Sequence, residues 1–346
     1  MADITIPIVD EAKLHPLFKR LINSPAYQPG RKLIKEIAEE FIDIDGNLFE
    51  QFQTTGFNQR LWELFLFEFF KENKFVIKRQ GDNPDFFITK ENIEIAVEAV
   101  TSNPTDKDEN TEQLVKKAFD FKNKDEQKTA NRHIIDQTTI KLGSALFSKL
   151  QKEYWEKNHI KGKPLIFAIE AFHHSYANNF PDYKIASYLY GFEIKKEIDD
   201  HGNSISKYEF TTEYGFNGKK IPFGFFNLEE AKNVSAIIFT NTGNIDKFNR
   251  MGSEKGYCDD KVILFRVGTF YTPEKIEYFE YYVGSGEHTE TWSEGVSIFH
   301  NPNALIPIPK DIFHPNRQMW QVGKNFDGYM PDFFPYVSET GNLFIE

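Results

Sequence analysis

The sequence predicts an α/β fold of the α+β type, with a mixed central sheet flanked by helices and then an aromatic-rich, mainly β C-terminal region. Apolar residues recur at helical spacing over 57–73. Short β-rich runs separated by turn residues follow, namely FVIKRQ, PDFFITK and NIEIAVEAVT. A helical stretch over 133–158 and the apolar strand in KGKPLIFAIEAF complete the order helix, three strands, helix, strand.

Length and composition predict more than one packed core. The chain has 346 residues, of which 40% are hydrophobic, and it contains 35 Phe and 15 Tyr. This much apolar surface favours two or three domains and argues against a mainly disordered chain. We expect a helical segment over 1–56, the core over 57–180, and a β-rich region over 181–346. The last region continues or flanks the core and is a candidate for substrate recognition.

The sequence also indicates where the protein works. Its one cysteine, Cys258, excludes an internal disulfide, and its first residues lack the basic and apolar parts of a secretion signal. No stretch approaches the roughly 18 apolar residues of a membrane-spanning helix. We therefore expect a cytoplasmic protein with no membrane partner.

The formal charge of −11 argues against a surface built throughout for polyanions. Between Lys116 and Lys163, however, about twelve Lys or Arg stand against about six Asp or Glu. A side that faces nucleic acid and a solvated helix face explain this stretch equally well.

Two carboxylates predict a divalent-metal site. Asp85 in NPDFFI and Glu98 in IAVEAV lie on consecutive predicted strands. If TKEN forms the turn, Ile88 pairs with Ile93 and Asp85 lies opposite Ala96, so Glu98 is the diagonal neighbour of Asp85 on the same face. A glutamate deep in a strand needs a partner, and a cation with oxygen ligands is one. Surface acids on an edge hairpin are the alternative.

These residues resemble the PD-(D/E)XK nuclease superfamily, whose restriction-endonuclease-like core is a helix, a three-strand meander, a second helix and a further strand. Pro84 and Asp85 match the PD of the motif, and Glu98 matches its second acidic residue. The resemblance implies a further acidic residue on the preceding helix, for which Glu63 is the better candidate and Glu68 the weaker. It covers roughly residues 57–172.

One position departs from the family pattern. The family places a lysine two residues after the second acidic residue, and this chain has Val100 there. Lys149, on the apolar side of the 133–158 helix, is our candidate substitute, and Lys141 is the second choice. A Lys149 side chain that only extends its ammonium group to water is an equally good explanation. Gln80 is a candidate for positioning substrate or water.

The resemblance implies Mg²⁺- or Mn²⁺-dependent hydrolysis of phosphodiester bonds, with Asp85, Glu98 and Glu63 around the metal and Lys149 as a catalytic group. It suggests a DNA endonuclease of a bacterial restriction or defence type, and a homodimer is compatible with it. The main alternative is a non-catalytic relative that binds nucleic acid or regulates. A carbohydrate-active enzyme with paired carboxylates is a third hypothesis.

One more basic segment is a candidate for substrate contact. The run FTNTGNIDKFNRMGSEKG carries Lys247 and Arg250 between glycines, without the spacing of a phosphate-binding P-loop. A loop that contacts substrate is one interpretation of this run, and the sequence supports nothing more specific.

Overall fold

The computed structural model describes residues 3–79, 83–103, 111–118, 122–198, 204–216, 218–272 and 275–345. The chain divides into two compact units. Unit 1 comprises residues 1–101, 240–296 and 331–346, and unit 2 comprises 102–239 and 297–330. The regions expected from the sequence, 1–56, 57–180 and 181–346, are contiguous. Each unit instead combines segments from both halves of the chain.

Unit 1 begins with helices, and one of them, α4, belongs to the core. Helix α4 has buried side chains on every side, including the unbroken run from Arg60 to Leu66. Helix α8 packs against α2, and this close approach needs glycine: a Cβ at Gly252 would lie 2.4 Å from the carbonyl oxygen of Pro29. The helices of this unit are α1 (Pro16–Asn23), α2 (Gln28–Glu40), α3 (Leu48–Gln53), α4 (Phe57–Glu72) and α8 (Ile245–Glu254).

The expected three-strand meander follows α4 directly. Strands β1 (Val76–Lys78), β2 (Phe86–Lys90) and β3 (Ile93–Ser102) pair in antiparallel order. The expected pairing of Ile88 with Ile93 is wrong, because Ile88 pairs with Ile95. The turn consists of two residues, Glu91 and Asn92, which both have positive φ, at 52° and 62°. A tight turn of this kind matches the twist of the strands.

The turn itself allows a stability test. Glu91 adopts a left-handed backbone conformation (φ 52°) that disfavours most side chains and that asparagine tolerates better. We expect Glu91→Asn to raise the free energy of unfolding by about 0.5 kcal/mol, as measured by urea denaturation. Unchanged or lower stability would contradict the two-residue turn.

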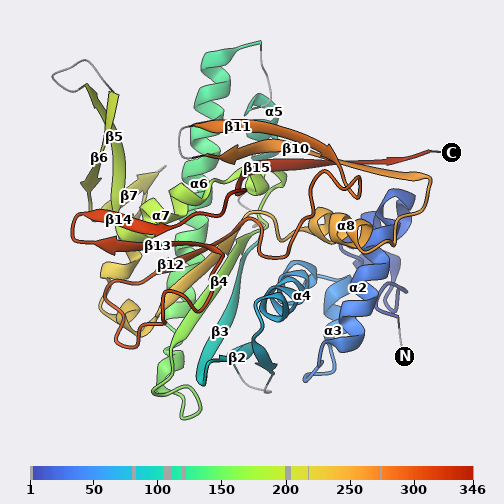
Figure 1. The fold of residues 1–346 in the computed structure, drawn as a ribbon, viewed down its shortest axis with the longest axis horizontal. Coiled ribbons are helices and arrows are strands. Elements are labelled where there is room, and N and C mark those ends of the chain that lie inside the picture. The colour runs from blue at the N-terminus through green and yellow to red at the C-terminus, as the bar shows by residue number, and fades with distance from the viewer. Residues whose placement is uncertain are drawn as a thin grey trace. The chain divides into compact units, whose positions relative to one another are not determined.

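A second sheet of unit 1 has the order β11-β10-β15. Its strands β10 (Val262–Tyr271), β11 (Ile276–Tyr282) and β15 (Pro335–Phe344) lie side by side in Figure 1, and both pairings are antiparallel. Arg266 of β10 is buried, whereas its neighbours Phe265 and Val267 are partly exposed. Alternation along the strand therefore gives this sheet one buried and one accessible face.

Unit 2 is organised around a mixed sheet with the order β4-β9-β12-β13-β14. Strand β4 pairs in parallel with β9, and β12 pairs in parallel with β13, whereas β14 is antiparallel to β13. The prediction that VSAIIFTN extends the sheet of the preceding region is confirmed by the pairing of β9 with β4. The strands are β4 (Leu165–Ala171), β9 (Ala236–Thr240), β12 (Val296–His300), β13 (Arg317–Val322) and β14 (Asn325–Tyr329).

The long helix of unit 2 differs from its expected bounds. Helix α6 spans Lys124–Leu150 rather than 133–158. It starts earlier than expected because the Asn123 side chain caps it, accepting a hydrogen bond from the Glu126 N–H at 3.2 Å. It packs against α5 (Thr111–Ala118), α7 (Asp182–Tyr190) and β4. Two antiparallel hairpins complete the unit, β5 (Phe192–Ile198) with β6 (Ser204–Phe210), and β7 (Glu213–Phe216) with β8 (Lys219–Pro222).

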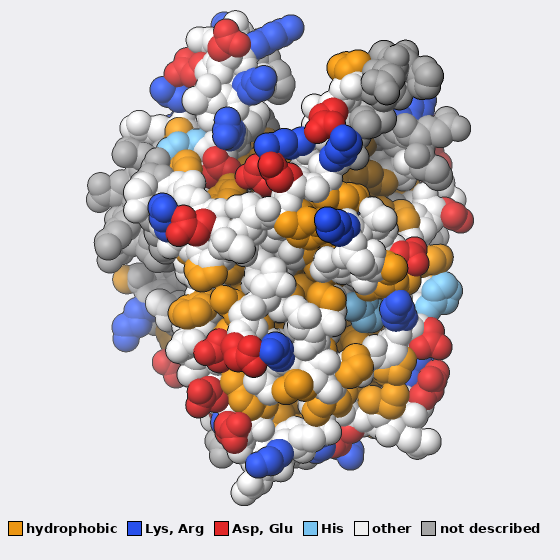
Figure 2. Space-filling model, turned by 90° about the vertical axis from the view of Figure 1, so that its left-hand side faces the viewer, with side chains coloured by type: hydrophobic (Ala, Val, Ile, Leu, Met, Phe, Trp, Pro, Cys, Tyr) orange, Lys and Arg blue, Asp and Glu red, His pale blue; other side chains and the backbone are white. Residues whose placement is uncertain are grey.

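The expected mixed α/β class with a mixed sheet and flanking helices is confirmed, whereas the restriction-endonuclease-like core stays a prediction. Among the described residues, no helix is both long and apolar enough to cross a membrane. On the face drawn in Figure 2, Lys and Arg side chains lie among Asp and Glu side chains and broad hydrophobic areas. Charges of both signs thus share this face.

Candidate functional site

The strand register places Asp85 beside the part of β3 that carries Glu98. Phe86 pairs with Val97, and Asp85 directly precedes β2 at the end of this ladder. The Ala99 N–H donates a 2.7 Å hydrogen bond to Asp85 Oδ2. This bond holds the Asp85 carboxylate against β3 at the point where β2 begins.

Glu98 lies deep within unit 1. Its side chain is 1% exposed, in a stretch of β3 where every residue from Ile95 to Val100 is buried. The Thr101 hydroxyl donates to Gln59 Oε1 of α4 at 2.9 Å, so the odd-numbered residues at this end of β3 face α4. Because side chains alternate along a strand, Glu98 projects from the other face.

Glu63 belongs to a buried charge cluster. Its Oε2 atom accepts from Arg60 Nη1 at 2.7 Å and from Arg79 Nη2 at 3.2 Å. Its Oε1 atom accepts from Gln59 Nε2 at 3.2 Å. Both carboxylate oxygens thus have partners, and two guanidinium groups balance the charge. Glu63 is therefore the counter-ion of two arginines, and its role as a metal ligand stays a prediction.

Arg79 links this cluster to the Asp85 segment. Its Nε donates to the Asp85 carbonyl at 3.4 Å and its Nη1 to the Ile42 carbonyl at 2.6 Å. The guanidinium lies over the Phe41 ring, 3.9 Å from the centroid. Burial lowers the pKa of Arg79, and the charges of Glu63 and Asp85 oppose that shift. Arg79 therefore positions the backbone from which the Asp85 carboxylate projects.

The structure therefore groups fewer metal-binding side chains than the sequence predicted. Among the described residues, no group of three or more His, Cys, Asp or Glu side chains is arranged to hold a metal ion. Asp85 and Glu98 remain as candidate ligands, and Mg²⁺ commonly binds one or two protein carboxylates and completes its shell with water and substrate phosphates. The hydrogen bond from Ala99 to Asp85 is also of the kind that orients ligating carboxylates. Asp85 and Glu98 therefore stay the predicted Mg²⁺ ligands.

The other expected site residues are distributed over α4, β3 and α6. Val100 is buried at the position of the family's lysine. Lys149 and Lys141 are on α6 and belong to unit 2, so they are not part of the unit that carries Asp85 and Glu98. Glu68, the weaker alternative to Glu63, forms a 2.9 Å ion pair with Lys71. Gln80 lies outside the described residues.

Three residues of this site were not predicted. Gln59 and Arg60 are on α4 beside Glu63, and Arg79 follows β1. The spacing of Arg60 and Glu63, three residues apart on a helix, was a visible signal for an ion pair. Arg79 is sixteen residues from Glu63, and no local pattern indicated their contact.

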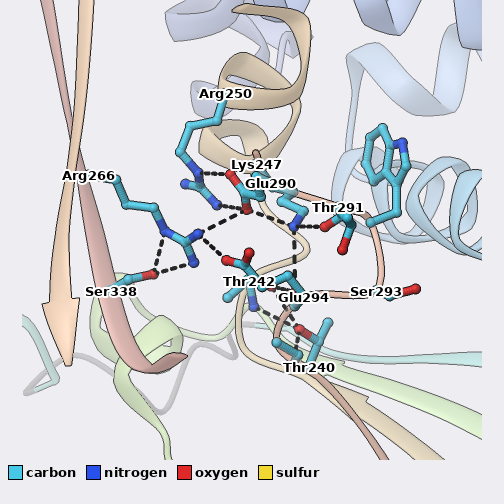
Figure 3. A network of polar contacts seen from close by, with 12 residues as sticks. Thr240, Thr242, Lys247, Arg250, Arg266, Glu290, Thr291, Ser293, Glu294 and Ser338 are labelled. Atoms are coloured by element: carbon cyan, nitrogen blue, oxygen red, sulfur yellow. Dashed lines mark hydrogen bonds and ion pairs between the residues drawn. The ribbon is translucent and has the colours of Figure 1, made fainter. Parts of the chain in front are cut away.

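A second charge cluster involves the segment expected to contact substrate. That expectation is wrong, because most of the segment forms α8, and Lys247 and Arg250 are buried in it. Lys247 Nζ donates to Glu290 Oε1 at 2.7 Å, and Arg250 Nε donates to Glu290 Oε2 at 2.6 Å. Figure 3 shows both side chains pointing toward Glu290. They stabilise the interior and are not accessible to a ligand.

The same cluster receives Arg266 from β10. Its Nη1 atom lies 3.3 Å from Glu290 Oε1 and also pairs with Glu294 Oε1. The Ser338 hydroxyl accepts from Arg266 Nε and Nη2 at 3.1 and 3.0 Å. Burial raises the pKa of Tyr281, whose hydroxyl accepts from Arg266, to about 12. Three cations and two carboxylates thus share one buried region.

No protein-family model, no curated protein and no solved structure matches the chain.

Proposed function

We propose that this protein is a metal-dependent nuclease that hydrolyses phosphodiester bonds of DNA, with Asp85 and Glu98 as the metal-binding pair. The observation that carries the proposal is the hydrogen bond from the Ala99 N–H to Asp85, because it holds the Asp85 carboxylate next to the residue that follows Glu98 on β3. The order α4, β1, β2, β3, α5, α6, β4 supports the proposal, because it is the order of the PD-(D/E)XK core with α5 added. A restriction or defence role follows from that resemblance alone.

The residues of unit 1 have separable roles in this proposal. A bound Mg²⁺ lowers the pKa of a coordinated water and neutralises charge on the phosphate. Asp85 and Glu98 hold the ion, and the Ala99 N–H orients Asp85. Arg79 holds the Asp85 backbone, and Glu63 keeps Arg60 and Arg79 in place. Lys149 remains the candidate for the lysine function.

Exposed basic residues in unit 2 support a nucleic-acid substrate. Helices α5 and α6 pack together and expose several lysines of the basic stretch. Phosphate neutralisation by such side chains provides the sequence-independent part of nucleic-acid affinity. The exposed lysines are Lys116, Lys117, Lys122, Lys124 and Lys128.

The test is cleavage of plasmid and single-stranded DNA with Mg²⁺ or Mn²⁺. We expect Asp85→Asn and Glu98→Gln each to reduce the cleavage rate by about tenfold or more, because both changes remove a metal-binding charge. Glu94→Gln is the matched control: Glu94 is on β3 near the turn and forms a 3.8 Å ion pair with Lys78. Cleavage that survives in both site variants would overturn the proposal.

A second candidate, a non-catalytic nucleic-acid-binding protein, is favoured by Val100, whose buried apolar side chain occupies the position of the family's lysine. It predicts salt-dependent binding of DNA without cleavage on any substrate. Lys149→Ala separates the two. Loss of cleavage with binding retained supports a nuclease with a relocated lysine, whereas binding without cleavage already in the wild type supports the second candidate.

A further inference from the structure

The accessible face of the β11-β10-β15 sheet contains a cavity of about 520 Å³. This volume lies within the range of about 300–1,000 Å³ that is typical of small-molecule sites. Its apolar lining comes mainly from β10 and β15, through Ile263, Phe265, Val267 and Leu343. The cavity is in unit 1 and uses none of the residues of the carboxylate site.

The floor of the cavity depends on one glycine. Phe265 pairs with Gly341 on β15 and with Tyr282 on β11. A Cβ at Gly341 would lie 2.0 Å from the Phe265 ring, so the ring occupies space that any side chain at this position would fill. Tyr282 remains 62% exposed beside it. The cavity therefore presents aromatic surface to solvent.

The polar lining has one sign of charge. Glu280 and Glu287 are exposed and line the cavity, and none of its described lining residues is Lys, Arg or His. The Tyr278 hydroxyl donates to Glu280 Oε2 at 2.5 Å, which fixes that carboxylate on the same strand. Carboxylates beside aromatic rings attract cations through charge and through the ring faces.

We infer that this cavity binds a small organic ammonium ion with an aliphatic chain. The chain contacts Phe265, Ile263 and Leu343, and the ammonium group lies between the two carboxylates and Tyr282. The apolar lining explains the need for a chain, and the charge explains the preference for a cation. This inference is independent of the proposed nuclease activity.

The test uses hexylammonium, with 1-hexanol and hexanoate as probes of equal chain length and different charge. Binding is followed by methyl NMR of Ile- and Leu-labelled full-length protein, with Ile263 and Leu343 as reporters inside the cavity. Ile276, on the same sheet but outside the lining, is the internal reference. We expect hexylammonium to shift both reporters with a Kd at least about fivefold lower than that of hexanol, and hexanoate to bind least.

Two variants test the carboxylates. Glu280→Gln and Glu287→Gln together are expected to raise the Kd for hexylammonium about fivefold or more and to leave the Kd for hexanol unchanged. Glu277→Gln is the control, because Glu277 is on the same strand but does not line the cavity and pairs with Lys275 at 3.3 Å. Equal affinity for hexanol and hexylammonium, or no shift of Ile263 and Leu343, would overturn the inference.

Discussion

Replacing Glu290 by glutamine is expected to lower the free energy of unfolding by about 3–5 kcal/mol, because it leaves buried cations without their shared carboxylate. Glu290 is 3% exposed and pairs with Lys247, Arg250 and Arg266. A glutamine keeps the shape but removes the charge on which three cations depend. Urea denaturation monitored by tryptophan fluorescence measures the change.

Two further variants keep this prediction testable. Glu277→Gln removes a partly exposed carboxylate and should change stability by less than about 0.5 kcal/mol. Lys247→Met removes one of the three cations and leaves two cations with two carboxylates. It should therefore lower the free energy of unfolding clearly less than Glu290→Gln does. If Lys247→Met proves the more damaging of the two, Glu290 is not the centre of the cluster.

The same cluster predicts a pH dependence. Burial opposes the ionisation of Glu290, but Arg250, Arg266 and Lys247 outweigh burial and hold its pKa well below 4.5. A lowered pKa in the folded state adds stability that is present above pH 4.5 and is lost as the pH falls toward the folded value. The stability difference between wild type and Glu290→Gln should therefore shrink below pH 4.5. A constant difference would contradict this account.

The second large effect is expected at Glu63. Glu63→Ala should lower the free energy of unfolding by about 2–4 kcal/mol, since Arg60 and Arg79 lose their common buried counter-ion. The cost is below that at Glu290 because Arg60 also donates to Gln51 and Asn47, each at 2.8 Å. The measurement is again urea denaturation, with Glu68→Ala on the same helix as the control.

A second variant, Glu63→Gln, decides what Glu63 does in the proposed nuclease. Because Glu63 balances two arginines, folded Glu63→Gln should keep metal-dependent cleavage within about threefold of the wild type, whereas Asp85→Asn should not. Stable Glu63→Gln protein without cleavage would instead assign Glu63 to the metal site.

The order of elements around the site was predictable because it depends on local periodicity. The 3.6-residue pattern of α4 and the short apolar runs of β2, β3 and β4 are properties of adjacent residues. The start of α6 was misplaced because its first turns are polar and carry no apolar stripe. Its signal was the cap Asn123, followed by Asp125 and Glu126 in the first turn.

The details of the site needed the structure. Glu91 gives no local sign of a turn with positive φ, so the expected register was shifted by two residues and Ile88 was paired with Ile93 instead of Ile95. The pairing of Glu63 with Arg79 was also hidden, because sixteen residues separate them. Both features depend on the three-dimensional arrangement of the chain, which the local sequence pattern does not give.

The sequence by itself determined the mixed α/β class, the helix and meander that carry Asp85 and Glu98, and the absence of a lysine at Val100. Only the tertiary structure decided that Glu63, Lys247 and Arg250 are internal counter-ions and that the β11-β10-β15 sheet has an accessible acidic cavity. Hydrophobic periodicity depends on residues only a few positions apart. A buried charge needs a partner because its removal from water is costly, and that partner can lie on a segment that is distant in the chain.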